Sequence, residues 1–441
     1  MKKYLFLPIL FFMGSYQTLF ANFYNAQTLI LDNGFKFVFV KNPRVEQSAH
    51  YSLIYNVGAR DENATLHKTG LAHFLEHLMF HGTTLYPPNI YETIIYKAGG
   101  EQNAETEHDY TKYYATIPKE NLIEILEIEA DRMQNLLIEA DAFEKEKSVV
   151  LEEICGADEA DLLEPYRQGV RDRLYNGHPY QRPIGGIRPN IENLTIDDAY
   201  DFYRKYYQPC NATLYIEANL DFDDISQHVN IIFAPLQNNT PIIRQVINLN
   251  PPINRKLHIH RSENQENAHF NRTYRLPISN LRDKAALELL CSFLNFKSCS
   301  FNQFLIDQKK ITNDLGISFN SNQKDFWIIE ISFIFDHKNF ELNQLNEIID
   351  QAFTKTLESE DINEAKLSEI RKAAEYNNMC IMTVFPSYNH LFTQTIALGQ
   401  PIENLESSLI IEKELAYTDI KNSLKTLINN KEYLTSCLLT Q

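Results

Sequence analysis

The chain has 441 residues, of which 44% are hydrophobic and 22% are charged, so its composition is that of a globular protein and excludes disordered and fibrous classes. Its length favours two domains of roughly 200 residues each. Lys and Arg number 41 against 58 Asp and Glu, which gives a net charge of −17. No basic run interleaved with aromatic residues offsets this charge, which argues against nucleic-acid binding and favours cationic substrates.

The beginning of the chain predicts export. Two lysines precede the apolar run 4–13, and Ala21 is a small residue where a signal peptidase would cleave. We expect a signal peptide over residues 1–21. An uncleaved anchor is the alternative, but the apolar core is too short for one and is interrupted by a proline and a glycine. No later stretch of the sequence reaches the ~18 apolar residues of a membrane span, so we expect no span in the mature chain.

The first half mixes strands and helices in an irregular order. Asp-Asn-Gly at 32–34 is typical of a tight hairpin turn, and apolar residues recur at a helical period from Leu122 to Leu137. Such mixing predicts an α+β fold. The expected elements are two strands within 28–40, a strand over 50–55, a helix over 71–80, a strand over 110–117, and helices over 119–137 and 141–154.

A polar segment rich in turn-forming residues, 236–252, divides the chain nearly in half and is the best linker candidate. We therefore expect a first domain over 22–235 and a second over 253–441. The second half again has α+β character. Its expected elements are a helix over 283–296, a strand over 326–335, and helices over 342–357 and 362–376.

The helix over 71–80 carries the most informative motif. Its apolar residues follow an i, i+3, i+4, i+7 pattern, which predicts a core-facing stripe. His73 and His77 lie one turn apart on another face, close enough to share one metal ion, and Glu76 lies beside them. The order His-x-x-Glu-His is a signature of zinc peptidases.

A catalytic zinc ion usually has three protein ligands, so two histidines require a third donor. The helix over 141–154 offers Glu144, Glu146, Glu152 and Glu153. Glu146 and Glu153 are two turns apart and share a face, whereas Glu152 is rotated by about 100° from Glu153. Spacing alone does not choose between them.

Together these motifs resemble the insulinase (pitrilysin) family of zinc peptidases, in its short, single-length form. The resemblance is strong from Thr28 to Asp221 and looser afterwards. Besides His73-Phe-Leu-Glu-His77, it rests on Asn33-Gly34, Val57-Gly-Ala-Arg60, Gly82-Thr83, Gly99-Gly100, Asn103-Ala104, Thr106, Asp109, Thr111, Tyr113, Glu146, Val149-Val-Leu-Glu-Glu153, His178-Pro-Tyr180, Tyr207-Gln-Pro209 and Asn211-Ala212.

The resemblance implies two similar domains of the insulinase and mitochondrial-processing-peptidase type, each a sheet with helices, which form half of a clam-like chamber. It implies one Zn²⁺ per chain, held in the first domain by His73, His77 and Glu153. Glu153 lies in a Val-x-x-Glu context 76 positions after His77, as the family's distal ligand does. Glu76 would be the general base.

The same resemblance assigns supporting residues. Glu146 corresponds to a family carboxylate that supports the metal site from the second shell. Asn103 and Ala104 would belong to an edge strand on which the substrate backbone is laid. His81 continues the i, i+4 series but stands next to Gly82, so we expect it in the second shell or at the surface.

These assignments predict a secreted zinc endopeptidase that hydrolyses short or unfolded peptides, located in the periplasm if the source is Gram-negative. Zinc would activate a water molecule and polarise the peptide carbonyl, and Glu76 would move the proton. The alternative is a non-catalytic scaffold or assembly subunit. A scaffold has no need of the complete set His73, Glu76, His77 and Glu153, and a metal-storage role is disfavoured because only one compact site is readable.

One departure from the family concerns the second half. Active members carry an Arg and a Tyr there, which grip the substrate and the transition-state oxyanion. The comparable stretch here, 301–318, contains neither, and Lys310 lacks the planar fork of an arginine. We therefore expect a second insulinase-family subunit to supply Arg and Tyr, with a homodimer as the alternative.

Overall fold

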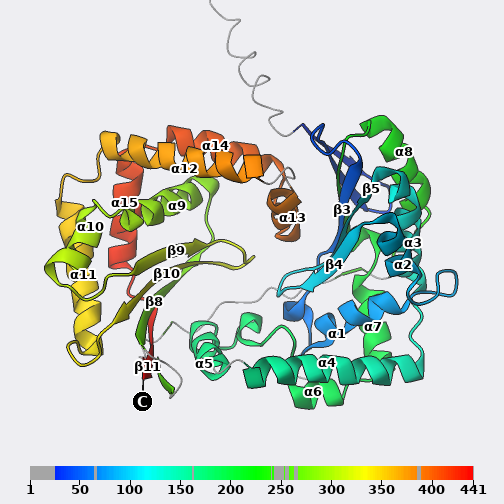
Figure 1. Cartoon of the computed structure of the whole chain (residues 1–441), viewed down its shortest axis with the longest axis horizontal. Helices are drawn as coiled ribbons and strands as arrows, with labels where there is room; N and C mark the ends of the chain where they lie inside the picture. Colours follow the sequence, from blue (N-terminus) through cyan, green and yellow to red (C-terminus); the bar gives the residue numbers. More distant parts are fainter. Residues whose placement is uncertain are drawn as a thin grey trace, which may run out of the picture.

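The computed structural model describes residues 25–63, 67–160, 163–239, 241–242, 253, 258–262, 267–384 and 389–440. The predicted signal peptide, 1–21, lies outside the described residues, as does most of the predicted linker. The described residues form two mixed sheets, each packed against helices, so the α+β prediction is confirmed (Figure 1). Within the described part of the chain, no helix has the length and hydropathy needed to cross a bilayer.

The first sheet has the strand order β1-β2-β6-β3-β5-β4. Strands β2 and β6 run parallel, and every other neighbouring pair is antiparallel. Strands β2, β3 and β6 are buried on both faces, although β3 and β6 carry polar residues such as His50 and Glu217 on one of them, whereas β4 is polar and forms an edge. The strands are β1 (Ala26–Ile30), β2 (Lys36–Lys41), β3 (Ser48–Tyr55), β4 (Glu101–Thr106), β5 (Thr111–Pro118) and β6 (Ala212–Ala218).

Helices of the first half, with the exception of α5, cover one face of this sheet. The predicted stripe of α1 is buried, with Leu71, Phe74, Leu75 and Leu78 in the same hydrophobic core as strand residues such as Tyr51. The helices are α1 (Leu71–Leu78), α2 (Ile90–Ala98), α3 (Leu122–Asn135), α4 (Ala140–Ala160), α5 (Glu164–Leu174), α6 (Arg188–Glu192), α7 (Ile196–Tyr206) and α8 (Phe222–Phe233).

The second sheet has the order β7-β11-β8-β10-β9, so the last strand of the chain lies inside it. Its strands are β7 (His258–Ser262), β8 (Ala268–Pro277), β9 (Leu315–Asn320), β10 (Phe326–Phe335) and β11 (Tyr433–Thr440). Its helices are α9 (Leu281–Asn295), α10 (Ser300–Gln303), α11 (Leu342–Glu358), α12 (Glu364–Val384), α14 (Glu403–Glu414) and α15 (Tyr417–Asn429). The strand expected over 326–335 matches β10, and the helix expected over 342–357 matches α11 to within one residue.

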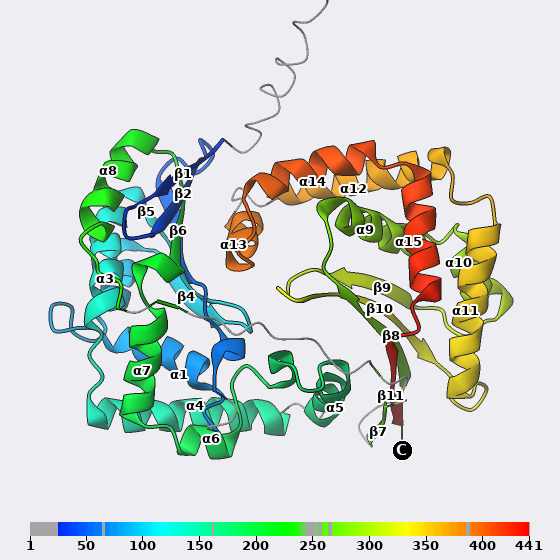
Figure 2. The same ribbon diagram turned by 180° about the vertical axis from the view of Figure 1, so that it is seen from behind.

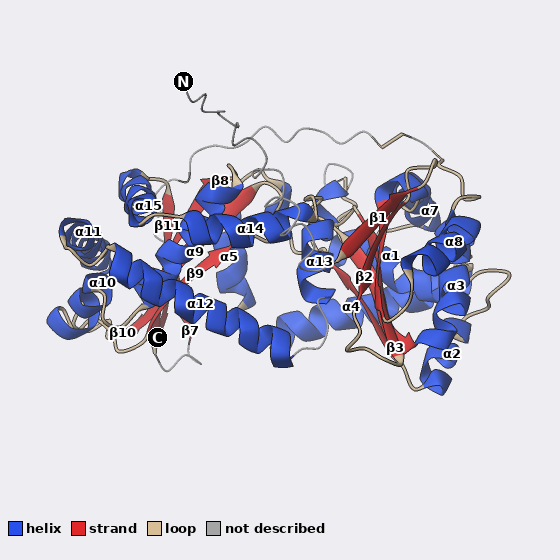
Figure 3. Ribbon diagram, turned by 90° about the horizontal axis from the view of Figure 1, so that it is seen from above, coloured by secondary structure: helices blue, strands red, loops and turns tan. Residues whose placement is uncertain are grey.

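Each half also packs a helix against the sheet of the other half, as Figures 2 and 3 show. Helix α13 (Asn389–Ala397) lies on the face of the first sheet opposite α1, where Phe392 stacks on Tyr215 with ring centroids 5.4 Å apart. Helix α5 packs against β7 and β11, and Tyr166 and Ser436 are joined by a hydrogen bond of 2.9 Å. This exchange buries apolar surface between the two halves and holds them together.

A polar cluster fixes the turn between β9 and β10 to the first half. Arg60 forms ion pairs with Asp109 at 2.7 Å and with Asp325 of that turn at 2.8 Å. Tyr180 donates to Asp109 at 2.7 Å, and the Nε2 atom of His178 lies 3.0 Å from Asp325. Asp109 and Tyr180 are buried, so the orientation of the halves depends on directional contacts as well as on the covalent connection.

Candidate metal centre

Helix α1 presents His73 and His77 on one face, with ring centroids 4.8 Å apart. Its first turn is held by a side chain from the preceding loop. The Glu62 carboxylate accepts hydrogen bonds from the backbone N–H groups of Gly70 and Ala72, both at 2.9 Å. Gly70 has a φ of 89°, a conformation that glycine adopts without strain. These contacts satisfy N–H groups that a helix start leaves unpaired, and they hold the histidine-bearing turn in place.

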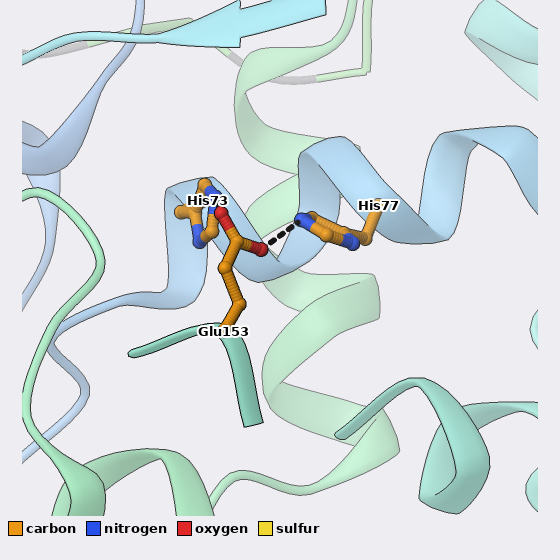
Figure 4. Close-up of side chains that lie close together, drawn as sticks. All are labelled: His73, His77 and Glu153. Carbon is orange, nitrogen blue, oxygen red and sulfur yellow. Dashed lines mark ion pairs between the residues drawn. The ribbon is translucent and has the colours of Figure 1, made fainter. Parts of the chain in front are cut away.

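Helix α4 brings Glu153 to the two imidazoles, as Figure 4 shows. Its Oε1 atom lies 3.8 Å from Nε2 of His73, and its Oε2 atom lies 3.3 Å from Nε2 of His77. Donor atoms of these three residues all lie within 4.8 Å of one another, and among the described residues no other group of this kind is found. Glu152 is exposed and contributes no donor atom to the group.

The three donors fit a zinc ion. Two imidazole nitrogens and a carboxylate oxygen are a donor set that zinc prefers, and bonds of ~2.0–2.2 Å in a tetrahedron separate neighbouring donors by about 3.4 Å. The Nε2-to-oxygen distances of 3.3 and 3.8 Å are close to this value. Burial and the nearby His77 lower the pKa of His73 to about 4, so this ring is neutral near pH 7 and has a lone pair for a metal.

Glu146 orients the second histidine. Its carboxylate lies 2.9 Å from Nδ1 of His77 and 3.0 Å from Nε2 of His81, and these hydrogen bonds lower its pKa to about 2. Burial acts to lower the pKa of His77, but its hydrogen bond with Glu146 and the charge of Glu153 outweigh burial and raise it. Because a carboxylate can only accept, Nδ1 of His77 donates, which leaves the lone pair of the neutral ring on Nε2, facing Glu153.

This arrangement yields a prediction for Glu146→Gln. We expect the apparent zinc affinity to fall about 10- to 100-fold, because an amide holds the His77 tautomer less firmly than a carboxylate does. Competition with a fluorescent zinc chelator measures the affinity. Glu144→Gln is the matched control, since this exposed acid on the same helix pairs with Lys147. An unchanged affinity in Glu146→Gln would contradict the orienting role.

Glu76 lies beside the two histidines and is buried. Thr106, at the end of β4, donates a hydrogen bond of 2.5 Å to its Oε2 atom. Burial raises the pKa of Glu76, and the bond from Thr106 partly offsets that rise. A carboxylate with a raised pKa is a stronger base, which suits a group that must accept a proton near neutral pH.

A cavity of about 1560 Å³ opens next to these residues. His73, Glu76, His77 and Glu153 line it, as do Asn103, Ala104 and the rest of the β4 segment 102–106. Strand β4 is the last strand of its sheet, so one of its edges has no neighbouring strand within the described residues. The geometry thus brings together the residues that the family resemblance assigned to the site, and leaves out the other two candidate donors, Glu144 and Glu152.

Sequence reasoning assigns no side-chain role to Thr106 or Glu62, although Thr106 is part of the family motif. The alternation of side chains along a strand gives a signal for Thr106, because it places 102, 104 and 106 on one face. No spacing rule gives such a signal for Glu62, whose partners on α1, the N–H groups of Gly70 and Ala72, come eight and ten positions later in the chain.

Two family models match this chain. One, described as "Insulinase (Peptidase family M16)", matches residues 37–186, and the other, described as "Peptidase M16 inactive domain", matches residues 193–374. The chain belongs to the insulinase family. The first model spans α1 and α4, and hence all three donors of the candidate metal centre. The second begins in the first half, where it covers α7, β6 and α8, and in the second half it covers β7 to β10 and α9 to α11 but not α13 to α15 or β11.

Proteins similar to this insulinase-family chain include some that are named as zinc proteases. Zinc protease PqqE of Helicobacter pylori is 26% identical over 358 residues, which cover 78% of this chain and 77% of PqqE. A protease from Helicobacter pylori of known crystal structure has a TM-score of 0.80 and 22% identity, covering 94% of this chain and 99% of that one. The periplasmic protease PqqL from Escherichia coli has a TM-score of 0.79 and 17% identity over 94% of this chain. This chain spans only about half of PqqL, 47% of its length.

Proposed function

We propose that this chain is a zinc-dependent endopeptidase that hydrolyses short or unfolded peptides. The observation that carries the proposal is the convergence of His73, His77 and Glu153 beside a buried Glu76, at a cavity lined by an edge strand. His73, His77 and Glu153 would hold one Zn²⁺ per chain. The naming of PqqE as a zinc protease agrees with this assignment.

In the proposed reaction, bound zinc supplies Lewis-acid polarisation of the peptide carbonyl and lowers the pKa of a water molecule. Glu76 accepts the proton of the attacking water and passes it to the nitrogen of the leaving amine. The hydrogen bond from Thr106 holds the Glu76 carboxylate in place. Glu146 keeps the Nε2 atom of His77 directed toward Glu153.

Strand β4 would hold the substrate. An extended peptide can add to an unpaired strand edge through main-chain hydrogen bonds, which give affinity with little demand on sequence. We assign Asn103 and Ala104 to this contact because both line the cavity. Folded proteins offer few extended segments, so the arrangement favours short or unfolded substrates.

A second subunit completes the proposed enzyme. The stretch 301–318 contains no Arg and no Tyr, and its Phe301, Phe304 and Leu305 are buried in the second core. Loss of an oxyanion donor typically costs about 10²- to 10³-fold in rate. We therefore propose a partner chain of the same family that supplies these residues, or else a homodimer. PqqL, which is about twice as long, is consistent with this chain being one half of a chamber.

We propose the same cellular location and the same domain limits that the sequence predicts. Residues 1–21 would direct export, and the periplasmic location of PqqL supports a periplasmic one here. We place the domains at 22–235 and 253–441, because the first sheet ends with β6 and the second begins with β7.

Metal removal tests the proposed function. We expect one zinc ion per purified chain by metal analysis, and hydrolysis of an unfolded fluorogenic peptide when the chain is combined with its family partner. Treatment with 1,10-phenanthroline should abolish hydrolysis and added zinc should restore it, because His73, His77 and Glu153 alone cannot activate water. The non-chelating 1,7-phenanthroline is the control. If the chain binds zinc but hydrolyses no peptide, whether it is tested alone, as a dimer or with a partner, the result would instead favour the scaffold role.

A further inference from the structure

The walls of the cavity differ in their chemistry. Strand β4 provides a polar wall, with Asn103 and Glu105 among its residues. Another part of the wall is the segment 183–187 before α6, which reads Pro-Ile-Gly-Gly-Ile and lines the cavity together with Ile154 of α4. None of the side chains in this second part carries a polar atom. A peptide in the cavity would therefore meet a polar surface on β4 and an apolar surface on this segment.

The apolar wall adjoins the metal centre. A Cβ atom placed on Gly185 would lie 4.0 Å from the Nδ1 atom of His73 and 3.3 Å from the Cγ1 atom of Ile154. Ile184 and Ile187 stand on either side of Gly185 and the next glycine in the chain. An extended peptide advances ~3.3 Å per residue, so a side chain within two residues of the cleaved bond could reach this wall.

Backbone packing holds the apolar wall in place relative to His73. Gly186 has a φ of 77°, and a Cβ atom there would lie 2.5 Å from the carbonyl oxygen of Thr69 and 2.6 Å from the Cα atom of Gly70. Only a residue without a side chain allows this close approach. Helix α6, which follows the segment, packs against α4 (Figure 1). The segment 183–187 is thus fixed between the start of α1 and the helix that carries Glu153.

Ile187 departs from the usual choice of residue at the start of a helix. It is the N-cap residue of α6, its backbone is extended, and its side chain makes no hydrogen bond to the helix. Ser, Thr, Asn and Asp are preferred at this position because their side-chain oxygen accepts a hydrogen bond from a free N–H group, which isoleucine cannot do. The Ile187 side chain is 47% exposed and lines the cavity. Such departures from local preference are typical of functional positions.

Polar residues near the apolar wall are engaged with one another. Glu164 forms an ion pair with Arg171, and Gln168 donates a hydrogen bond of 2.7 Å to Asp172. Arg188, the residue after the segment, forms an ion pair within α6. These contacts satisfy the polar groups beside the wall, so the surface that it offers to a ligand is that of the isoleucines.

We propose that Ile187 is a specificity-determining residue, which together with Ile184 and Ile154 selects peptides with a large apolar side chain, such as leucine, within two residues of the cleaved bond. This inference rests on the proposed function, because it assigns a role to the substrate of that reaction. Strand β4 would hold the main chain while the isoleucines bind one side chain. Unfolded chains expose the apolar side chains that folded proteins bury, so such a subsite also favours unfolded substrates.

The test uses pairs of unfolded peptides that differ only by leucine or alanine at one position, moved through the two positions on each side of the cleaved bond. The zinc-loaded chain, combined with its family partner, hydrolyses each peptide, and mass spectrometry of the products identifies the bond. Leucine has three more carbons than alanine, and each fully buried methylene group changes an equilibrium constant about fourfold. Because the wall remains partly open, the wild type should prefer leucine in kcat/KM by about 5- to 50-fold at one position.

Replacement of Ile187 tests its role. Ile187→Thr should reduce the leucine preference by about threefold or more, because a hydroxyl group replaces apolar surface. Threonine is a preferred N-cap residue, so this variant should keep α6 and the fold. Ile30→Thr is the matched control, since Ile30 on β1 is 66% exposed and is not part of the cavity lining. The control should keep the preference of the wild type.

The same peptides, labelled and mixed with the zinc-loaded Glu76→Gln chain, give a readout that needs no hydrolysis. Fluorescence anisotropy should show the leucine preference, and the double variant with Ile187→Thr should show less of it. If no peptide is hydrolysed but the preference in binding depends on Ile187, the proposed function fails and the subsite stands. If peptides are hydrolysed while the leucine preference is absent, or is equal in wild type and Ile187→Thr, the subsite is overturned. An equal loss in Ile30→Thr would also overturn it, because the effect would then not depend on the cavity.

Discussion

The Glu76→Gln chain should bind zinc as the wild type does and hydrolyse peptides about 10²- to 10⁴-fold more slowly, the usual contribution of a positioned general base. Glutamine has nearly the same shape and can still bond to Thr106, but it cannot accept a proton at neutral pH. Glu76 contributes no donor atom to the group of His73, His77 and Glu153, so the metal should remain. Steady-state hydrolysis of a fluorogenic peptide, with the family partner present, measures the loss.

Zinc content and circular dichroism of the same preparations serve as controls for this experiment. Equal zinc content and equal helix content in the two proteins would attribute the loss of rate to the carboxylate itself. If Glu76→Gln retained the wild-type rate, Glu76 would not be the base, and the proposed assignment of the site would fail at its central residue.

A second large effect, on zinc affinity, is expected when Glu153, the proposed third zinc ligand, is replaced. Glu153→Gln should weaken zinc binding by more than the 10- to 100-fold expected for Glu146→Gln, because it replaces an anionic donor in direct contact with the ion. Glu152→Gln changes the same functional group one position earlier in the chain and should leave zinc affinity unchanged. Chelator competition on the two variants in parallel makes the comparison.

This pair of variants decides between alternatives that helix spacing leaves open. Both acids are exposed, but Glu152 contributes no donor atom to the group, whereas both carboxylate oxygens of Glu153 face the imidazoles. Weakened binding in Glu152→Gln with normal binding in Glu153→Gln would reverse the assignment. Equal effects would mean that neither acid binds zinc directly.

The packing of α4 explains why Glu153, and not Glu152, faces the two histidines. Phe143 and Val150 are buried in the first core, and the Phe143 ring lies 5.0 Å from that of Phe74 on α1. Glu146 and Glu153 each follow one of these anchors by three residues, so they lie on the flank of α4 that faces α1. The rotation of α4 about its axis is set by this packing. Periodicity within α4 could not reveal it, because the partner surface belongs to another part of the chain.

Features that depend on neighbouring residues could be read from the sequence alone. The hairpin of β1 and β2, the buried stripe of α1 and the i, i+4 spacing of His73 and His77 each depend on local geometry with a fixed period. The family motifs added the expected roles of Glu153 and Glu146. Helix spacing left open which acid of α4 faces the histidines, and tertiary structure shows that it is Glu153. Tertiary structure alone decided that Thr106 supports Glu76 and that α5 and α13 each pack on the sheet of the other half. Those contacts join residues far apart in the chain, and their geometry depends on how whole elements pack, which no local pattern encodes.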